Sequence, residues 1–185
     1  MKLHKEKYVA FLRGINVGGH HKVPMADLKK VLKNLGFENC ITLLNSGNII
    51  FEADEQPIKS LEQKLSSKLE SHFGFAIPTI TRTYNEINRT FVEAPFKNIE
   101  VTKDIRLYIS FLKEDKKIEL ELPWISQDGS FKVLQNSNGN IISILDLSIN
   151  KTPKAMEVLE KHYGKDITTR NWNTIVRIVN KIATT

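Results

Sequence analysis

The sequence predicts an α+β protein, because segments with strand and helix periodicity alternate along its first half. Apolar side chains at residues 6–13 indicate a buried strand. Apolar residues then recur at helical spacing from Met25 to Leu35, and Pro24 and Gly36 suit the start and the stop of that helix. A strand followed directly by an amphipathic helix is the first half of a β-α-β arrangement.

The chain then continues with a hairpin, a helix and a strand. The predicted segments are a strand at 41–44, a turn at Asn45-Ser46-Gly47-Asn48, a strand at 49–52, a helix from Pro57 to Leu69 and a strand at 77–83. The order β-α-β-β-α-β is that of the ferredoxin-like split motif, which places two helices on one face of a four-stranded antiparallel sheet. We therefore predict a ferredoxin-like subdomain over residues 1–83.

The second half is less regular. It is predicted to contain a short helix at 85–92, a strand at 105–112, a hairpin of strands at 130–134 and 140–147, a helix from Thr152-Pro153 to Tyr163, and a last amphipathic helix from Trp172 to Ile182. Residues 84–185 thus form a second α+β subdomain. One interpretation is a divergent ferredoxin-like copy of the first, although no sequence repeat is evident. Because no low-complexity linker separates the two, we expect them to pack tightly.

Composition restricts the classes to which the protein can belong. The hydrophobic fraction of 41% is ordinary for a globular protein. The sequence shows neither a run of about 18 apolar residues nor the apolar region of a signal peptide, so we expect no membrane partner. A single cysteine, Cys40, excludes an intramolecular disulfide and suits a reducing, cytoplasmic location. Cys40 precedes an apolar run, which favours a small buried side chain over a nucleophile.

The positive charge lies at the two ends of the chain. The formal net charge is +6 overall, and the segments 1–33, 34–150 and 151–185 carry +6, −4 and +4. If the two ends meet in the fold, they would form one basic surface suited to an anion. The alternative is that these lysines lie on solvated helix faces.

A glycine-rich loop follows the first strand. Residues 14–23 are longer than the usual connection between a strand and a helix and contain three glycines. Arg13, Asn16 and Lys22 bring polar and cationic groups to this loop, and Val23 at the predicted N-cap would leave helix amides available to an anion. The glycine spacing fits neither a dinucleotide fingerprint nor a Walker A loop. The loop therefore predicts a site for an anion or a phosphate-containing small molecule.

Two further segments contribute candidate residues. The hairpin turn places Ser46 and Asn48 after the second strand, where turn formation is the simpler role. Polar residues crowd the predicted start of the last helix, and capping does not explain Arg170 at a positive helix end. The full set of candidate ligand-binding residues is Arg13, Asn16, Gly18, Gly19, Lys22, Ser46, Asn48, Arg170, Asn171 and Asn173.

The sequence gives little sign of metal or covalent chemistry. His20 and His21 are adjacent and have no cysteine or carboxylate at ligand spacing, so we predict no metal site. No nucleophile elbow or Ser/His/Asp signature is readable. Catalytic residues and cofactors stay unassigned, and whether the protein is an enzyme stays open.

Three separated motifs resemble those of one bacterial family. The stretch YVAFLRGINVGGHHKVPM, residues 8–25, resembles the opening signature of the uncharacterised proteins called domain of unknown function 1697. The segments LNSGNIIF, residues 44–51, and TRNWNTI, residues 169–175, are similar to its second and C-terminal motifs. The resemblance covers nearly the whole chain. It implies a compact α/β fold with two ferredoxin-like halves, and it implies no established activity.

Three functions remain open on the sequence. The first is the site for an anionic or phosphorylated small molecule, built from Arg13, Asn16, Lys22 and Arg170. The second is a nucleic-acid-binding module, because ferredoxin-like sheets can bind RNA and the pI is about 9.3; among residues 46–51, however, only Phe51 is aromatic. The third is a non-enzymatic oligomeric interaction protein.

Overall fold

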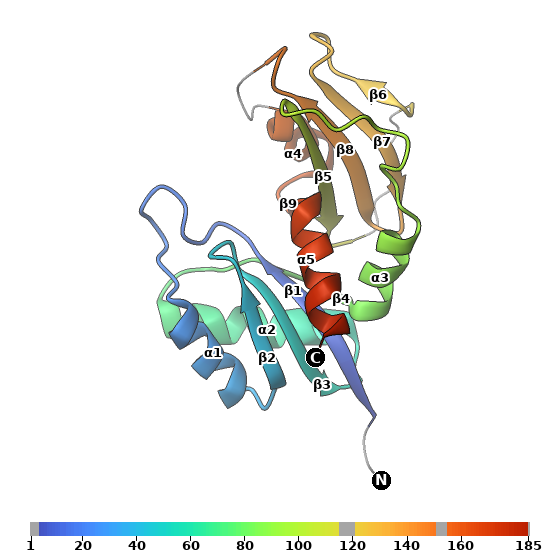
Figure 1. Cartoon of the computed structure of the whole chain (residues 1–185). Coiled ribbons are helices and arrows are strands. Elements are labelled where there is room, and N and C mark those ends of the chain that lie inside the picture. The colour runs from blue at the N-terminus through green and yellow to red at the C-terminus, as the bar shows by residue number, and fades with distance from the viewer. Residues whose placement is uncertain (1–3, 115–120, 151–154, 185) are drawn as a thin grey trace. The chain divides into compact units, whose positions relative to one another are not determined.

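The chain divides into two compact units, Met1–Arg89 and Thr90–Thr185. In this computed structural model, residues 4–114, 121–150 and 155–184 are described. They form a mixed α+β protein with two antiparallel sheets and five helices (Figure 1). The α+β class predicted from the sequence is confirmed.

Unit 1 has the predicted element order. It contains β1 (Lys5–Leu12), α1 (Met25–Asn34), β2 (Glu38–Leu43), β3 (Asn48–Asp54), α2 (Ile58–Phe73), β4 (Thr79–Thr83) and most of α3 (Tyr84–Val92). Its sheet has the order β2-β3-β1-β4, and all neighbouring strands are antiparallel. The short helix expected at 85–92 is α3.

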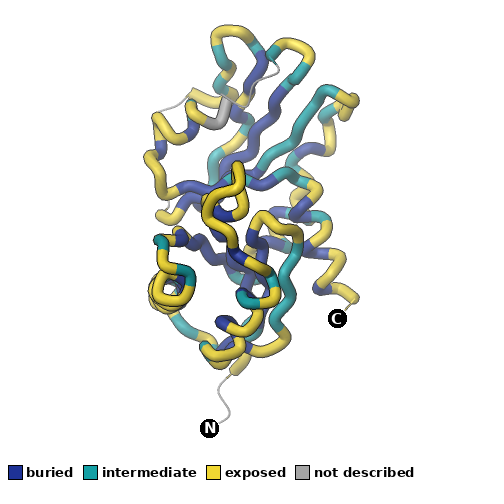
Figure 2. Tube along the Cα trace, turned by 90° about the vertical axis from the view of Figure 1, so that its left-hand side faces the viewer, coloured by how far each residue is buried: buried dark blue, intermediate teal, exposed yellow. Residues whose placement is uncertain are grey.

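The core of unit 1 lies between the sheet and the helices α1 and α2. Alternate residues of β1 face this core, and Phe51 of β3 stacks between Tyr8 and Phe37 with ring-centroid distances of 5.6 Å and 4.5 Å. The helices contribute Leu28, Val31, Leu32, Leu61, Leu65 and Leu69. In β1 and β3 the intervening residues Val9, Phe11 and Ile50 are also buried, whereas β2 is half-buried to exposed. Figure 2 shows buried and intermediate stretches of the trace joined by exposed ones.

Unit 2 is built around a second sheet. It contains β5 (Ile105–Leu112), β6 (Trp124–Ile125), β7 (Phe131–Ser137), β8 (Asn140–Asp146), α4 (Ala155–Tyr163), β9 (Ile167–Asn171) and α5 (Trp172–Ala183). The strand order is β6-β7-β8-β5-β9. Leu159 and Tyr163 of α4 pack on Leu112, Phe131 and Leu145. The predicted helix start at Thr152-Pro153 lies outside the described residues.

The sequence missed two strands of unit 2, and one error concerns a candidate site residue. β6 has only two residues, and β9 (ITTRN) has a single apolar side chain at the edge of its sheet, so neither shows strand periodicity. Arg170 was placed at the start of the last helix, but it lies in β9, and the helix begins after Asn171. The predicted N-cap Val23 was also wrong, because the N-cap of α1 is Pro24.

The two sheets share one pairing register. Phe11 of β1 pairs with Asn48 of β3, and Phe111 of β5 pairs in the same way with Asn140 of β8. The amide of Leu12 donates to Gly47 O at 2.8 Å, and the amide of Leu112 donates to Gly139 O at 2.8 Å. On the other side of the central strand, β1 pairs with β4 as β5 pairs with β9.

This register reveals an internal repeat that is not evident from the sequence alone. The matched segments are YVAFLR (8–13) with YISFLK (108–113), GNII (47–50) with GNII (139–142), and TRTYNEI (81–87) with TRNWNTI (169–175). The spacings between the matched segments differ in the two units, because the connections differ in length, and this hides the repeat. The interpretation of the second half as a divergent copy of the first therefore gains direct support.

Candidate functional site

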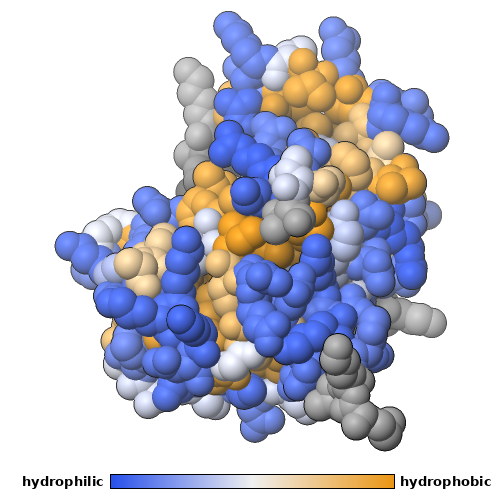
Figure 3. Space-filling model, turned by 60° about the horizontal axis from the view of Figure 1, so that its bottom comes forward, coloured by the Kyte–Doolittle hydropathy of each residue, from blue (hydrophilic) through white to orange (hydrophobic). Residues whose placement is uncertain are grey.

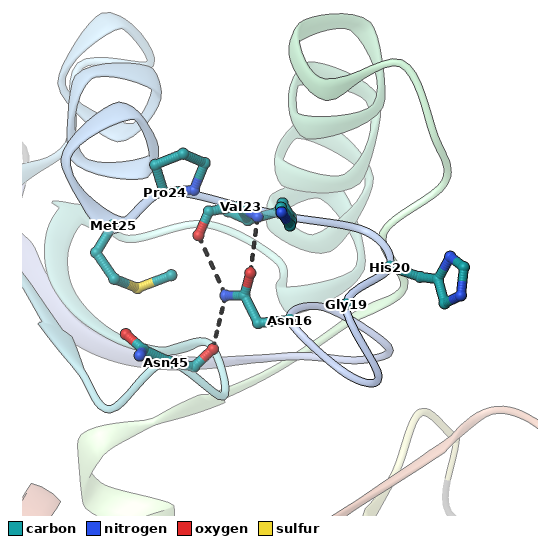
Figure 4. A pocket seen from close by; sticks show the side chains of 8 residues that line it. Asn16, Gly19, His20, Val23, Pro24, Met25 and Asn45 are labelled. Carbon is teal, nitrogen blue, oxygen red and sulfur yellow. Dashed lines mark hydrogen bonds between the residues drawn. The ribbon is translucent and has the colours of Figure 1, made fainter.

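The side chain of Asn16 holds the glycine-rich loop of unit 1 in place. Its amide nitrogen donates to Val23 O at 3.1 Å and to Asn45 O at 2.8 Å, and its oxygen accepts from Val23 N at 2.9 Å (Figure 4). One side chain thus joins the start of the loop, its end and the β2–β3 turn. Asn16 has a left-handed φ of 54°, which asparagine tolerates better than most residues.

Contacts within the loop fix the rest of its path. The amide of Asn16 donates to His21 O at 3.0 Å, and the amide of His20 donates to Val17 O at 3.0 Å. The ring of His21 lies 3.2 Å from Gly14 O through Nδ1 and stacks on Phe75 with a centroid distance of 4.5 Å. The loop is exposed to solvent and yet anchored at several points, so it presents a defined surface.

A cavity of about 430 Å³ opens beside this loop. It is lined by Asn16, Gly19, His20, Lys22, Val23, Pro24, Met25 and Asn45 (Figure 4). Its volume falls in the range of small-molecule sites in proteins. The lining residues include Lys22, two asparagines and the apolar Met25, whereas the ring of His20 points away from Asn16, Met25 and Asn45 in Figure 4. The cavity therefore offers contacts to both polar and apolar parts of a ligand.

The first turn of α1 borders this cavity. The N-cap Pro24 makes no side-chain hydrogen bond to the helix, and its carbonyl accepts from the amides of Asp27 at 3.1 Å and Leu28 at 3.0 Å. Asp27 puts a negative charge in this turn, but its carboxylate pairs with Lys30 at 3.0 Å. The ion pair reduces the repulsion that an anion near the helix start would meet.

The β2–β3 turn forms another wall of the site and depends on Gly47. This glycine has φ 74°, and a Cβ added to it would lie 2.7 Å from both Ile15 Cδ1 and Leu12 Cβ. The buried side chain of Asn48 donates to Leu43 O at 2.9 Å and to Ser46 Oγ at 3.0 Å. Asn48 and Ser46 therefore stabilise the turn, as the simpler interpretation of the sequence expected.

The structure brings some predicted residues of unit 1 together at the cavity. Asn16, Gly19 and Lys22 line it, whereas Gly18 lies in the same loop outside the lining. Arg13 follows the end of β1, is half-buried, and its backbone amide donates to Pro78 O at 2.9 Å. It is not among the lining residues.

The remaining predicted residues belong to unit 2. Arg170 is buried in β9, where its guanidinium donates to Thr168 Oγ1 at 2.8 Å and to Thr169 O at 2.9 Å. Burial lowers the pKa of Arg170 to about 10, so the side chain stays cationic at neutral pH. Asn171 caps α5 by accepting from the amide of Asn173 at 2.9 Å. The prediction that both ends of the chain share one cleft involves both units and stays a prediction.

Five of the lining residues were not in the predicted set of ligand-binding residues, although the sequence had indicated the helix amides next to Val23. His20, Val23, Pro24 and Met25 lie in the loop or at its junction with α1, where proximity to Lys22 was the available signal. Asn45 enters the site through its backbone, because its carbonyl accepts from Asn16. The residue types in the sequence do not predict a hydrogen bond to the backbone of a segment so far away in the chain.

Other chemistry finds little support in the part of the chain that the structure describes. Within residues 4–114, 121–150 and 155–184, no cluster of three His, Cys, Asp or Glu side chains could hold a metal ion. Burial raises the pKa of the half-buried Cys40 thiol, which disfavours the reactive thiolate. Over the same described ranges, no helix is both long enough and apolar enough to cross a membrane.

Comparison with known proteins gives a family and a fold. No curated protein matches the chain. A solved structure, described as that of the conserved bacterial protein SP0830 from Streptococcus pneumoniae, is similar with a TM-score of 0.73 and 25% sequence identity, and the alignment covers 96% of this chain and 98% of that one. The model of a protein family of unknown function, DUF1697, matches residues 5–123. The chain therefore belongs to the DUF1697 family, as its three motifs indicated.

Proposed function

We propose that unit 1 binds a small anionic molecule, such as a phosphorylated metabolite, in the cavity beside the glycine-rich loop. The observation that supports this best is the cavity of about 430 Å³ with Lys22 and His20 in its lining and the start of α1 at its edge. An ammonium group and a helix N-terminus both favour negative charge. The clamp made by Asn16 favours binding further, because a loop held in place loses little entropy when a ligand binds.

A nucleic-acid-binding function of the sheet finds less support. RNA-binding sheets of this type stack bases on exposed aromatic side chains. The aromatic residues in the described strands of unit 1 are Tyr8, Phe11 and Phe51, and each is at most 1% exposed. Phe51 packs in the core between two other rings. The proposal of an oligomeric interaction protein stays a prediction.

Titration of the full chain with inorganic phosphate, followed by amide chemical shifts, tests the proposal. We expect the largest shifts at Lys22, Val23 and Met25. Lys22→Gln removes the ammonium group from the cavity and should weaken phosphate binding about tenfold, which is the usual effect of one charge-assisted hydrogen bond. Lys33→Gln removes an exposed lysine of α1 that does not line the cavity and should leave the affinity unchanged.

Two results would contradict the proposal. One is the absence of phosphate-dependent shifts in the loop at millimolar phosphate. The other is equal weakening by both lysine variants, which would indicate diffuse attraction to a basic surface. A thermal-shift screen of nucleotides and phosphorylated metabolites then narrows the ligand, since a bound ligand raises the midpoint of unfolding. Steeply salt-dependent binding of an oligonucleotide would favour the nucleic-acid alternative instead.

A further inference from the structure

The equivalent hairpins of the two units are closed by different turns. In unit 2, Ser137 pairs with Asn140, and the two residues between them, Asn138 and Gly139, have φ of 52° and 70°. An Asn-Gly pair with two positive φ angles is the preferred two-residue hairpin turn. The fold itself therefore needs only two residues to close this hairpin.

The hairpin of unit 1 uses four residues and places a leucine in an unfavourable conformation. Leu43 pairs with Asn48, and Leu44 between them has φ 60°. A left-handed backbone conformation is uncommon for residues other than glycine, asparagine and aspartate. It is least favourable for bulky side chains such as leucine. Strain of this kind, kept where a simpler turn is available, suggests a role outside folding.

The strained leucine does not line the cavity itself but directly precedes a lining residue in the chain. Its neighbour Asn45 lines the cavity and is bonded to Asn16. On the loop side, Val17 follows Asn16, and its carbonyl accepts from His20. The side chains of Leu44 and Val17 are 45% and 68% exposed, which leaves apolar surface in water on two segments that border one cavity. Figure 3 shows one face of the molecule, on which hydrophobic surface lies among hydrophilic side chains.

We propose that the ligand of this cavity is a phosphate monoester carried on an aromatic group. The phosphate would bind beside Lys22 and the first turn of α1, and the aromatic group would cover Leu44, Val17 and the thioether of Met25. Methionine sulfur makes favourable contacts with aromatic rings, and burial of the rim side chains removes apolar surface from water. The inference rests on the proposed function, because it names the chemical class of ligand for the same site.

Isothermal titration of the full chain with three probes tests this inference. Phenyl phosphate carries both parts of the ligand, inorganic phosphate carries the anion alone, and phenol carries the ring alone. We expect phenyl phosphate to bind about tenfold more tightly than phosphate, because phosphate lacks the apolar contacts of the ring. We expect phenol to bind weakest, because it lacks the charged contacts of the phosphate.

Variants at the rim locate the apolar contact. Leu44→Ser should lower the affinity for phenyl phosphate towards that for phosphate, since Val17 and Met25 retain part of the apolar contact, and should leave phosphate binding unchanged. Leu44→Gly suits the left-handed backbone and should give the same loss without lowering the midpoint of thermal unfolding, which separates ligand binding from folding. Leu122→Ser is the matched control, since Leu122 is 39% exposed in unit 2.

The outcomes distinguish the inference from the function on which it rests. Equal affinity for phenyl phosphate and phosphate, with no effect of Leu44→Ser, would overturn the aromatic ligand and leave the anion site standing. Phenol binding as tightly as phenyl phosphate would overturn it as well, because the phosphate would then contribute nothing. Failure of both phosphates to bind at millimolar concentration would overturn the anion site and the inference together.

Discussion

Units 1 and 2 have the same strand pairing but differ at the same end of their sheets. After β1, unit 1 has the segment RGINVGGHHK (13–22), whereas after β5 unit 2 has KEDKKIELEL (113–122). The first contains three glycines and no acidic residue, and the second contains no glycine and four acidic residues. The hairpin turns differ too, with four residues in one unit and two in the other.

The difference separates what the fold requires from what the site requires. Residues shared by both units, such as Phe11 and Phe111 or Asn48 and Asn140, are buried in the strands and maintain the sheet. Among the described residues, the clamped loop and the four-residue turn belong to unit 1, and these border the cavity. The segment 13–22 carries a formal charge of +2, whereas 113–122, with three lysines and four acidic residues, carries −1, so we expect anion binding in unit 1.

The largest expected effect is a difference in stability loss between alanine variants of two glycines that have the same φ angle. Gly47 and Gly129 both have φ 74°, but only Gly47 faces atoms at 2.7 Å where a Cβ would lie. Gly129→Ala should destabilise by about 1 kcal/mol through backbone strain alone. Gly47→Ala should destabilise by about 3 kcal/mol because overpacking is added. Urea unfolding of both variants measures this, and equal losses would show that Leu12 and Ile15 move aside freely.

The second prediction tests the equivalence of the two units directly. Arg82 and Arg170 occupy the same register position, are 8% and 9% exposed, and each donates to the carbonyl of the preceding threonine at 2.9 Å. Arg82→Met and Arg170→Met should each destabilise by about 2 kcal/mol, because a buried acceptor loses its donor. Arg177→Met, on the exposed side of α5, should change stability little. If urea unfolding shows very different losses of stability for Arg82→Met and Arg170→Met, the two arginines are equivalent in position but not in their contribution to stability.

A third prediction sharpens the contrast between the loops. Asn16→Asp keeps the oxygen that accepts from Val23 N but replaces the amide nitrogen, which donates to two carbonyls, with a second oxygen. We expect a loss of about 1–2 kcal/mol and faster hydrogen exchange at Val23, since the loop loses its clamp. Asn138→Asp alters the corresponding turn of unit 2, at φ 52°, and should leave exchange in the glycine-rich loop unchanged. Unchanged exchange at Val23 in Asn16→Asp would show that the clamp is dispensable.

The smallest effect concerns acid stability in unit 2. Hydrogen bonds from Ser126, Asn150 and Ser130 hold the pKa of the exposed Asp128 carboxyl well below its ordinary value of 3.8. A depressed pKa in the folded state contributes stability above pH 3.8, and this contribution is lost as the pH falls further. Asp128→Asn should therefore give a flatter dependence of the unfolding midpoint on pH below about 4. If the unfolding midpoint of Asp128→Asn depends on pH below about 4 as steeply as that of the unaltered chain, Asp128 does not contribute to acid stability in this way.

Most of the fold was predictable because its signals are local. The strand at 105–112 matches β5, and the helix beginning at Trp172 matches α5, since apolar periodicity marks each. The strand β9 was not predictable in the same way, because its pairing with β5 compensates for the weak local pattern of ITTRN. The internal repeat appeared only once strand registers aligned segments separated by connections of unequal length.

The candidate site was predictable only in part. The glycines and Lys22 identified the loop, because their residue types are unusual between a strand and a helix. The role of Asn16 as a clamp could not be read from the sequence, since it depends on the carbonyl of Asn45 in a different hairpin. Arg170 was selected because a cation at the start of a helix is electrostatically unfavourable without an anionic partner. It lies in the edge strand β9 instead, so this argument for a ligand no longer applies.

The helix α3 runs through the boundary between the units, because it spans Tyr84–Val92 and the division falls after Arg89. Proteases cut most readily in exposed, irregular segments, and here the junction is hydrogen-bonded helix. A truncation that ends at the boundary would cut the last turn from this helix and leave Ile87 without its neighbours Thr90 and Phe91. A fragment made to express either unit alone should therefore include all of α3, so that its terminal helix is complete.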